Sequence, residues 1–117
     1  MLPAPTGDPS RFTSPVGSEV PTLFLGGRLD ATTPIEWSEA DRARFPHSAI
    51  VAAACMGHGV SVAAPECFGS VLSQFFGQLS TWSSASPLDT SCVATRCEAA
   101  ALEEDLFLED RLATRAP

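Results

Sequence analysis

The sequence contains no lysine and no tyrosine, and all seven of its basic residues are arginine. Fourteen acidic residues outnumber them, which gives a net charge of −7. Nucleic acids and anionic membranes both require a basic surface, so neither is an expected partner. The chain also lacks any apolar run near the ~18 residues that a membrane span requires. We therefore expect no nucleic-acid partner and no membrane partner.

Targeting and metal-binding signals are also missing. Residues 1–10 contain three prolines but neither a basic region nor an apolar run, so they are not expected to be a signal peptide. With only two histidines and cysteines spaced 12, 25 and 5 residues apart, the chain matches no zinc-ligand pattern, and we expect no metal or cofactor. The cysteines could form disulfides, but their spacing does not show which pairs form. They are Cys55, Cys67, Cys92 and Cys97.

A further absence concerns catalysis. The 117 residues contain no Gly-x-Ser-x-Gly, the motif that places a serine nucleophile on a sharp turn between a strand and a helix. What the chain does contain is 44% hydrophobic residues and a mean hydropathy of +0.11, which predict one folded domain. We interpret residues 1–19 as a linker, 20–92 as the domain and 93–117 as an acidic, helical tail.

The central part of the domain has the pattern of a βαβ unit. Apolar runs at 22–25 and 49–54 have the length of buried strands. Between them a helix is predicted from Pro34 to about Arg44, with Thr33 as its N-cap. Glu36 falls at the capping-box position. Strands joined by such a crossover should be parallel.

The remainder of the domain is predicted to be helical. From Glu66, apolar residues recur at helical spacing and predict packing against the sheet; they are Phe68, Val71, Leu72, Phe75, Phe76 and Leu79. Residues 80–91 are expected to be a loop, and a last helix is predicted from Glu98. The fold class is therefore α/β, with a sheet that one chain leaves incomplete. Its edges would need strands from another chain, a second copy or a longer protein.

Two titratable residues follow the predicted strands. Asp30 comes after the first strand, and His58 comes after the second, between two glycines. Because parallel strands end at the same edge of a sheet, the carboxylate should reach the imidazole and fix its tautomer. The other imidazole nitrogen could then accept a proton from a nucleophile. We therefore predict Asp30 and His58 as the acid and general base of a triad.

Residues 20–34, which read VPTLFLGGRLDATTP, resemble the acid-bearing stretch of α/β-hydrolases of the tripeptidyl- and prolyl-aminopeptidase type. Gly57-His58-Gly59 is similar to the histidine loop of that family. Cys67 and the segment 88–92 resemble its C-terminal end. The similarity covers residues 13–92. Over this range the chain resembles the TAP-like C-terminal part of these enzymes.

The resemblance implies a partial α/β-hydrolase fold, with Asp30 as the triad acid and His58 as the general base. It also implies a Cys67–Cys92 disulfide, which would suit a secreted or periplasmic enzyme. The sequence departs from the family at Ala31, where proline is usual. The nucleophile elbow, the oxyanion-hole loop and the substrate-selecting cap are absent as well.

The leading hypothesis is a C-terminal segment of a serine peptidase or esterase that has negligible activity alone. Its partner would be the missing N-terminal half. The alternative is a non-enzymatic module that self-associates through its open sheet, or that binds a protein partner through its tail or its phenylalanine-bearing helix.

Overall fold

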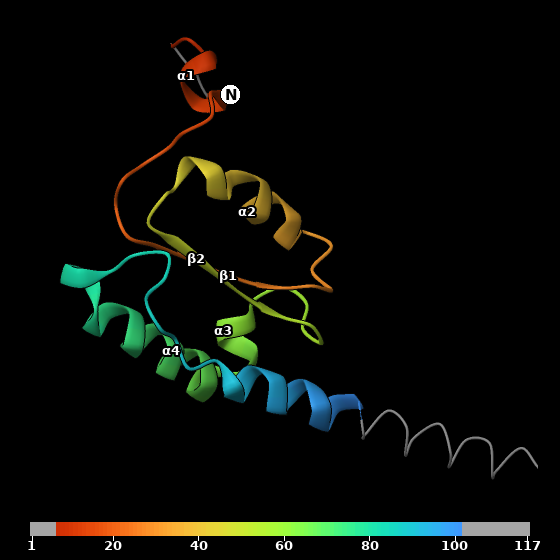
Figure 1. Ribbon diagram of the computed structural model, residues 1–117. Helices are drawn as coiled ribbons and strands as arrows, with labels where there is room; N and C mark the ends of the chain where they lie inside the picture. Colours follow the sequence, from red (N-terminus) through yellow and green to blue (C-terminus); the bar gives the residue numbers. More distant parts are fainter. Residues whose placement is uncertain (1–6, 102–117) are drawn as a thin grey trace, which may run out of the picture.

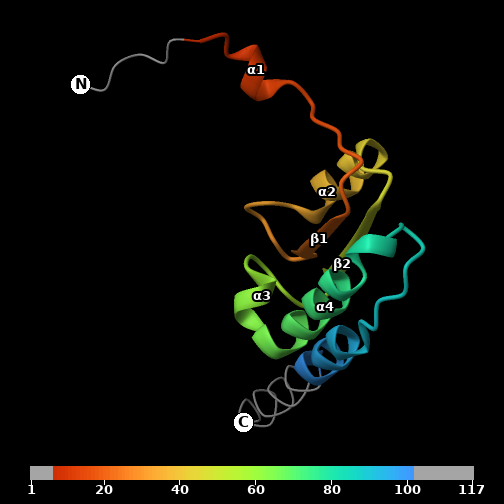
Figure 2. The same ribbon diagram turned by 90° about the vertical axis from the view of Figure 1, so that its left-hand side faces the viewer.

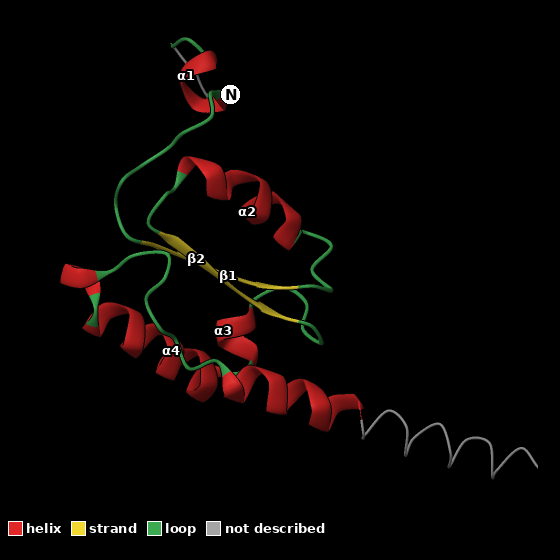
Figure 3. Ribbon diagram, viewed as in Figure 1, coloured by secondary structure: helices red, strands yellow, loops and turns green. Residues whose placement is uncertain are grey.

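The computed structural model describes residues 7–101 of the chain. Figure 3 shows the strands lying among the helices. In chain order the elements are α1 (Ser10–Thr13), β1 (Thr22–Gly27), α2 (Ile35–Asp41), the 3-10 turn η1 (Arg42–Arg44), β2 (Ser48–Ala53), α3 (Val60–Ala63), α4 (Pro65–Gly77), the 3-10 turn η2 (Leu79–Thr81) and a helix from residue 91 that is described as far as 101.

The two strands form a parallel sheet whose register runs from Thr22 opposite Ser48 to Gly27 opposite Ala53. The predicted βαβ unit is therefore confirmed. β1 extends two residues beyond its predicted end. Glycine is required at 27 because a Cβ there would lie 2.0 Å from the carbonyl oxygen of Met56.

The helices cover both faces of this sheet. Figure 1 shows α2 on one side of the strands and α3, α4 and the 91–101 helix on the other. On the α2 side, the Ile35 side chain lies over Gly26, where a Cβ would come within 2.5 Å of it. Figure 2 shows α1 standing apart from the sheet. No helix of the described part is long and apolar enough to cross a membrane.

The main core lies between β2 and α4. Phe68 and Val71 of α4 are fully buried against Val51 and Ala53 of β2. The predicted apolar stripe is correct at its centre but wrong at its C-terminal end, because Phe76 is 62% exposed and Leu79 is 41% exposed. Leu79 lies in η2, beyond the end of α4 at Gly77, and so is not part of the helical stripe.

The start of α2 differs from the prediction. The helix begins at Ile35 after Pro34, and no side chain caps it. The Thr33 hydroxyl oxygen therefore does not accept a backbone N–H as the predicted N-cap would, and the Glu36 side chain makes no capping-box hydrogen bond. The Thr33 hydroxyl donates to Asp30 instead. Pro34 has a ψ of 135°, outside the helical region, so the helix starts at Ile35 and not at Pro34.

The last helix begins at residue 91, not at Glu98 as predicted. The carboxylate of Asp89 accepts the backbone N–H of Ser91 at 3.0 Å, which satisfies a free donor at the start of this helix. Thr95 lies inside the helix, and its hydroxyl donates to the carbonyl of Ser91. The part of the predicted helical tail beyond residue 101 lies outside the described residues.

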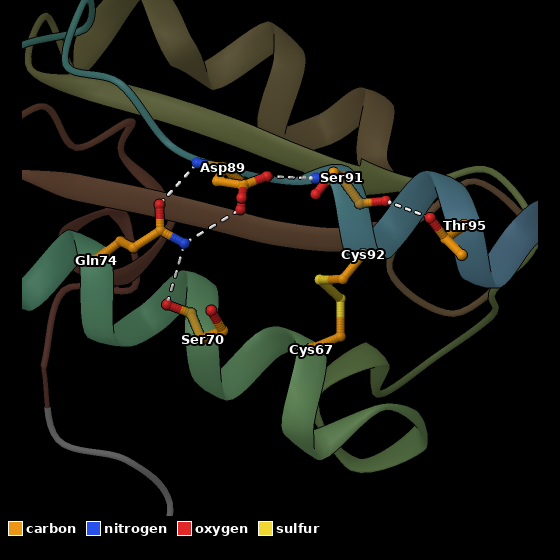
Figure 4. Close-up of a disulfide and its surroundings, with 7 residues drawn as sticks. All are labelled: Cys67, Ser70, Gln74, Asp89, Ser91, Cys92 and Thr95. Atoms are coloured by element: carbon orange, nitrogen blue, oxygen red, sulfur yellow. Dashed lines mark hydrogen bonds between the residues drawn. A yellow bond between two sulfur atoms is a disulfide. The ribbon is translucent and has the colours of Figure 1, made fainter.

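Two disulfides and a side-chain amide tie this region together. Cys67 pairs with Cys92, as the family resemblance implied, and Cys55 pairs with Cys97. In Figure 4, the Gln74 amide of α4 is bonded to the backbone of Asp89 on the neighbouring segment. The C-terminal helix is therefore held against α4 by both covalent and polar contacts.

Candidate active site

Asp30 lies in the loop between β1 and α2 and is only 8% exposed. Its Oδ1 accepts the backbone N–H groups of Thr32 and Thr33 at 2.8 and 2.9 Å. Its Oδ2 accepts the Thr33 hydroxyl at 2.8 Å. The loop therefore presents three donors to one carboxylate.

These donors favour the ionised form of the acid. The Thr33 backbone N–H is the main reason that the pKa of Asp30 lies well below its usual range, although burial acts in the opposite direction. Because the folded-state pKa is depressed, this carboxylate contributes stability above the unfolded pKa of about 3.9. That contribution is lost as pH falls through the folded-state value.

His58 lies in the loop after β2. Its Nδ1 is 2.9 Å from Oδ2 of Asp30, whereas the side chain as a whole is 64% exposed. Since Asp30 is an ionised acceptor, the hydrogen-bond network assigns the proton of the neutral ring to Nδ1. Nε2 is then left with a free lone pair. The sequence placed this pair 28 residues apart, and the fold brings the two side chains into contact.

The histidine loop is fixed against the end of β1. The N–H of Leu29 donates to the carbonyl of Met56 at 3.0 Å, and Gly27 allows this close approach. Gly59 has a φ of +75°, a left-handed conformation that glycine adopts without steric cost. The loop backbone therefore holds His58 beside Asp30.

A hollow of about 310 Å³ opens beside the two side chains. Leu25 and Gly26 line it together, although neighbouring strand residues point to opposite faces of a sheet. Ile35 of α2 and Val60 of α3 also line it, and these helices cover opposite faces. The hollow therefore lies at the outer edge of β1.

Two residues of this site were missed by the sequence reasoning. Thr33 was assigned to a helix cap, although its position three residues after Asp30 also suits a hydrogen bond to that carboxylate. Trp37 lines the hollow and is 63% exposed, and no sequence signal distinguished it from an ordinary surface residue of α2.

Cys67 and Cys92 do not line the hollow. Among residues 7–101, no group of three or more His, Cys, Asp or Glu side chains could hold a metal ion.

An acid and a histidine that follow successive parallel strands and meet at one sheet edge are the arrangement of an α/β-hydrolase. Comparison with protein families gives the same class and matches residues 1–92 to the family described as TAP-like protein. The chain therefore belongs to this TAP-like α/β-hydrolase family. Comparisons with curated proteins and with solved structures give no match.

Proposed function

We propose that this chain supplies the acid and the general base of a serine peptidase or esterase, and that its nucleophile comes from outside these 117 residues. The observation that carries the proposal is the contact between buried Asp30 and exposed His58, which leaves Nε2 free beside a hollow. The 117 residues hold no Gly-x-Ser-x-Gly that could fill that position.

The outer edge of β1 is the place where the complementary part would dock. Thr22 and Arg28 direct their N–H groups toward β2, so the intervening Leu23 and Leu25 direct theirs outward. A parallel strand added there would end beside the hollow, as β1 does. A serine on a strand-to-helix turn at the carboxyl end of the sheet extended in this way would lie at the same end as Nε2 of His58.

In the assembled enzyme, His58 Nε2 would accept the hydroxyl proton as the serine oxygen attacks the substrate carbonyl carbon. The same nitrogen would then return the proton to the leaving alcohol or amine. Asp30 would remain ionised and stabilise the imidazolium. Without a nucleophile or an oxyanion hole, the chain alone would form no acyl-enzyme.

Complementation tests this proposal. The probe is the N-terminal half of a TAP-like hydrolase, cut ahead of its acid-bearing strand. Mixing it with this chain should produce turnover of a p-nitrophenyl ester or an aminoacyl p-nitroanilide, whereas each part alone stays at background. Binding should also bury Trp37 and shift its fluorescence to the blue, measured in a Trp82→Phe background.

The control is the same N-terminal half with its nucleophilic serine replaced by alanine, which should shift Trp37 fluorescence without turnover. Binding without activity from the intact serine-bearing half would contradict the catalytic role. An unchanged Trp37 spectrum would contradict docking at the β1 edge.

A second candidate function is self-association. A hollow of about 700 Å³ lies at the opposite edge of the sheet, where Ile50 and Val51 of β2 line it between Glu39 of α2 and Val93 of the C-terminal helix. An uncovered strand edge can pair with another copy. Light scattering after size-exclusion chromatography should then give a dimer mass, and a compact monomer would exclude this candidate.

A further inference from the structure

We propose that Thr33 is a positioning residue of the Asp30–His58 pair: its hydroxyl orients the carboxylate so that Oδ2 holds the Nδ1–H tautomer of His58. The catalytic consequence rests on the function proposed above. The effect on the tautomer does not, because it is a property of this chain alone.

The geometry gives Thr33 contacts with both members of the pair. Its Oγ1 lies 2.8 Å from Oδ2 of Asp30 and 3.2 Å from Nδ1 of His58. The single hydroxyl proton is directed to Oδ2, since an ionised carboxylate is the stronger acceptor. The threonine oxygen then faces Nδ1 with a lone pair and is complementary only to a protonated Nδ1.

The competing tautomer is disfavoured by the same contacts. If the proton were on Nε2, the Nδ1 lone pair would face Oδ2 of Asp30 at 2.9 Å, without a hydrogen between them. The Thr33 hydroxyl could compensate for this repulsion only by donating to Nδ1. Oδ2 of Asp30 would then lose its hydrogen bond from Thr33. Because His58 is 64% exposed, little other packing would hold its ring in place.

A helix-capping role for the hydroxyl would be the ordinary alternative. The structure does not support it, because α2 begins at Ile35 with no side-chain cap. Oδ1 of Asp30 accepts the backbone N–H groups of Thr32 and Thr33. These backbone groups remain when the Thr33 side chain is replaced by any residue other than proline. Replacing the side chain therefore leaves Oδ1 bonded but removes the hydroxyl that holds Oδ2, so Oδ2 can turn away from Nδ1 of His58.

The test uses the full chain and two variants, Thr33→Val and Thr33→Ser. Long-range ¹H–¹⁵N NMR correlations of His58, recorded at a pH at which the ring is neutral, report which nitrogen carries the proton. We expect the Nδ1–H pattern in the native chain and in Thr33→Ser. In Thr33→Val, we expect a mixture of tautomers in a chain that still unfolds cooperatively, with a lower urea midpoint because a hydrogen bond to the buried Asp30 carboxylate is lost.

An Nδ1–H pattern retained in Thr33→Val would overturn the proposal, as would a mixture already present in the native chain. In the complemented enzyme, Thr33→Val should lower kcat roughly 10- to 100-fold with little change in KM, the size expected for one hydrogen bond to a charged group. If no activity is ever recovered, the proposed function fails, while the NMR result still decides the role of Thr33.

Discussion

Replacing His58 with alanine should lower kcat of the complemented enzyme by at least about 10³-fold, with KM nearly unchanged. Under the proposed function, the His58 imidazole would move the proton of the incoming serine and would not be needed to bind substrate. Steady-state kinetics of the mixture with a p-nitrophenyl ester measure both constants. The expected loss is large because no other titratable side chain of the described residues lines the hollow except Asp30.

The other histidine offers a matched control. His47 lies 3.2 Å from Glu19 and does not line the hollow, so His47→Ala should retain kcat. Asp30→Asn should lower kcat by about 10³- to 10⁴-fold, because an amide can donate to the ring and stabilise the wrong tautomer. Equal kcat values for His58→Ala and the native enzyme would refute general-base catalysis by this residue.

Removing the Cys55–Cys97 disulfide should lower the free energy of unfolding substantially. The bridge closes a segment of 42 residues that contains the 25-residue Cys67–Cys92 segment. With the inner bridge intact, 42 less 25 leaves an effective loop of 17 residues. Loop-closure entropy for that length corresponds to about 3 kcal/mol. This is a substantial fraction of the 5–15 kcal/mol typical of a domain.

The double variant Cys55→Ser/Cys97→Ser, studied by urea unfolding, measures this loss. Hydrogen exchange should also show weaker protection in residues 91–101, since Cys97 anchors that helix to the start of the histidine loop. The matched variant Cys67→Ser/Cys92→Ser leaves the outer bridge in place and serves as the comparison. An unfolding midpoint that stays at the native value in the first variant would show that this bridge adds no stability.

Much of the site could be predicted because its main determinants are local in sequence. Apolar runs of strand length on either side of a helix-length interval specify a parallel βαβ unit, and parallel strands end at one edge. Asp30 and His58 each follow a strand, so their proximity follows from topology. No distant contact had to be known to anticipate it.

Thr33 shows where local reasoning stops. By sequence it suits two hydrogen-bonding roles equally well, capping the next helix or supporting the preceding carboxylate. Asp30 lies in the same loop, three residues before Thr33, but the His58 ring that completes the contact follows another strand. At the start of the helix from residue 91, the Asp89 hydrogen bond to Ser91 is local, whereas the Cys67–Cys92 disulfide and the Gln74 contact with Asp89 come from α4.

The sequence by itself determined the class of fold, the acid and the histidine, and the lack of a serine elbow within these 117 residues. Each of these follows from short-range patterns of polarity, spacing and residue type. Only the tertiary structure decided the pairing of Cys55 with Cys97, the role of Thr33 and the hollow at the edge of β1. Each of these features joins segments from different elements. Which donor, acceptor or thiol a group pairs with depends on the groups that lie next to it in the folded chain.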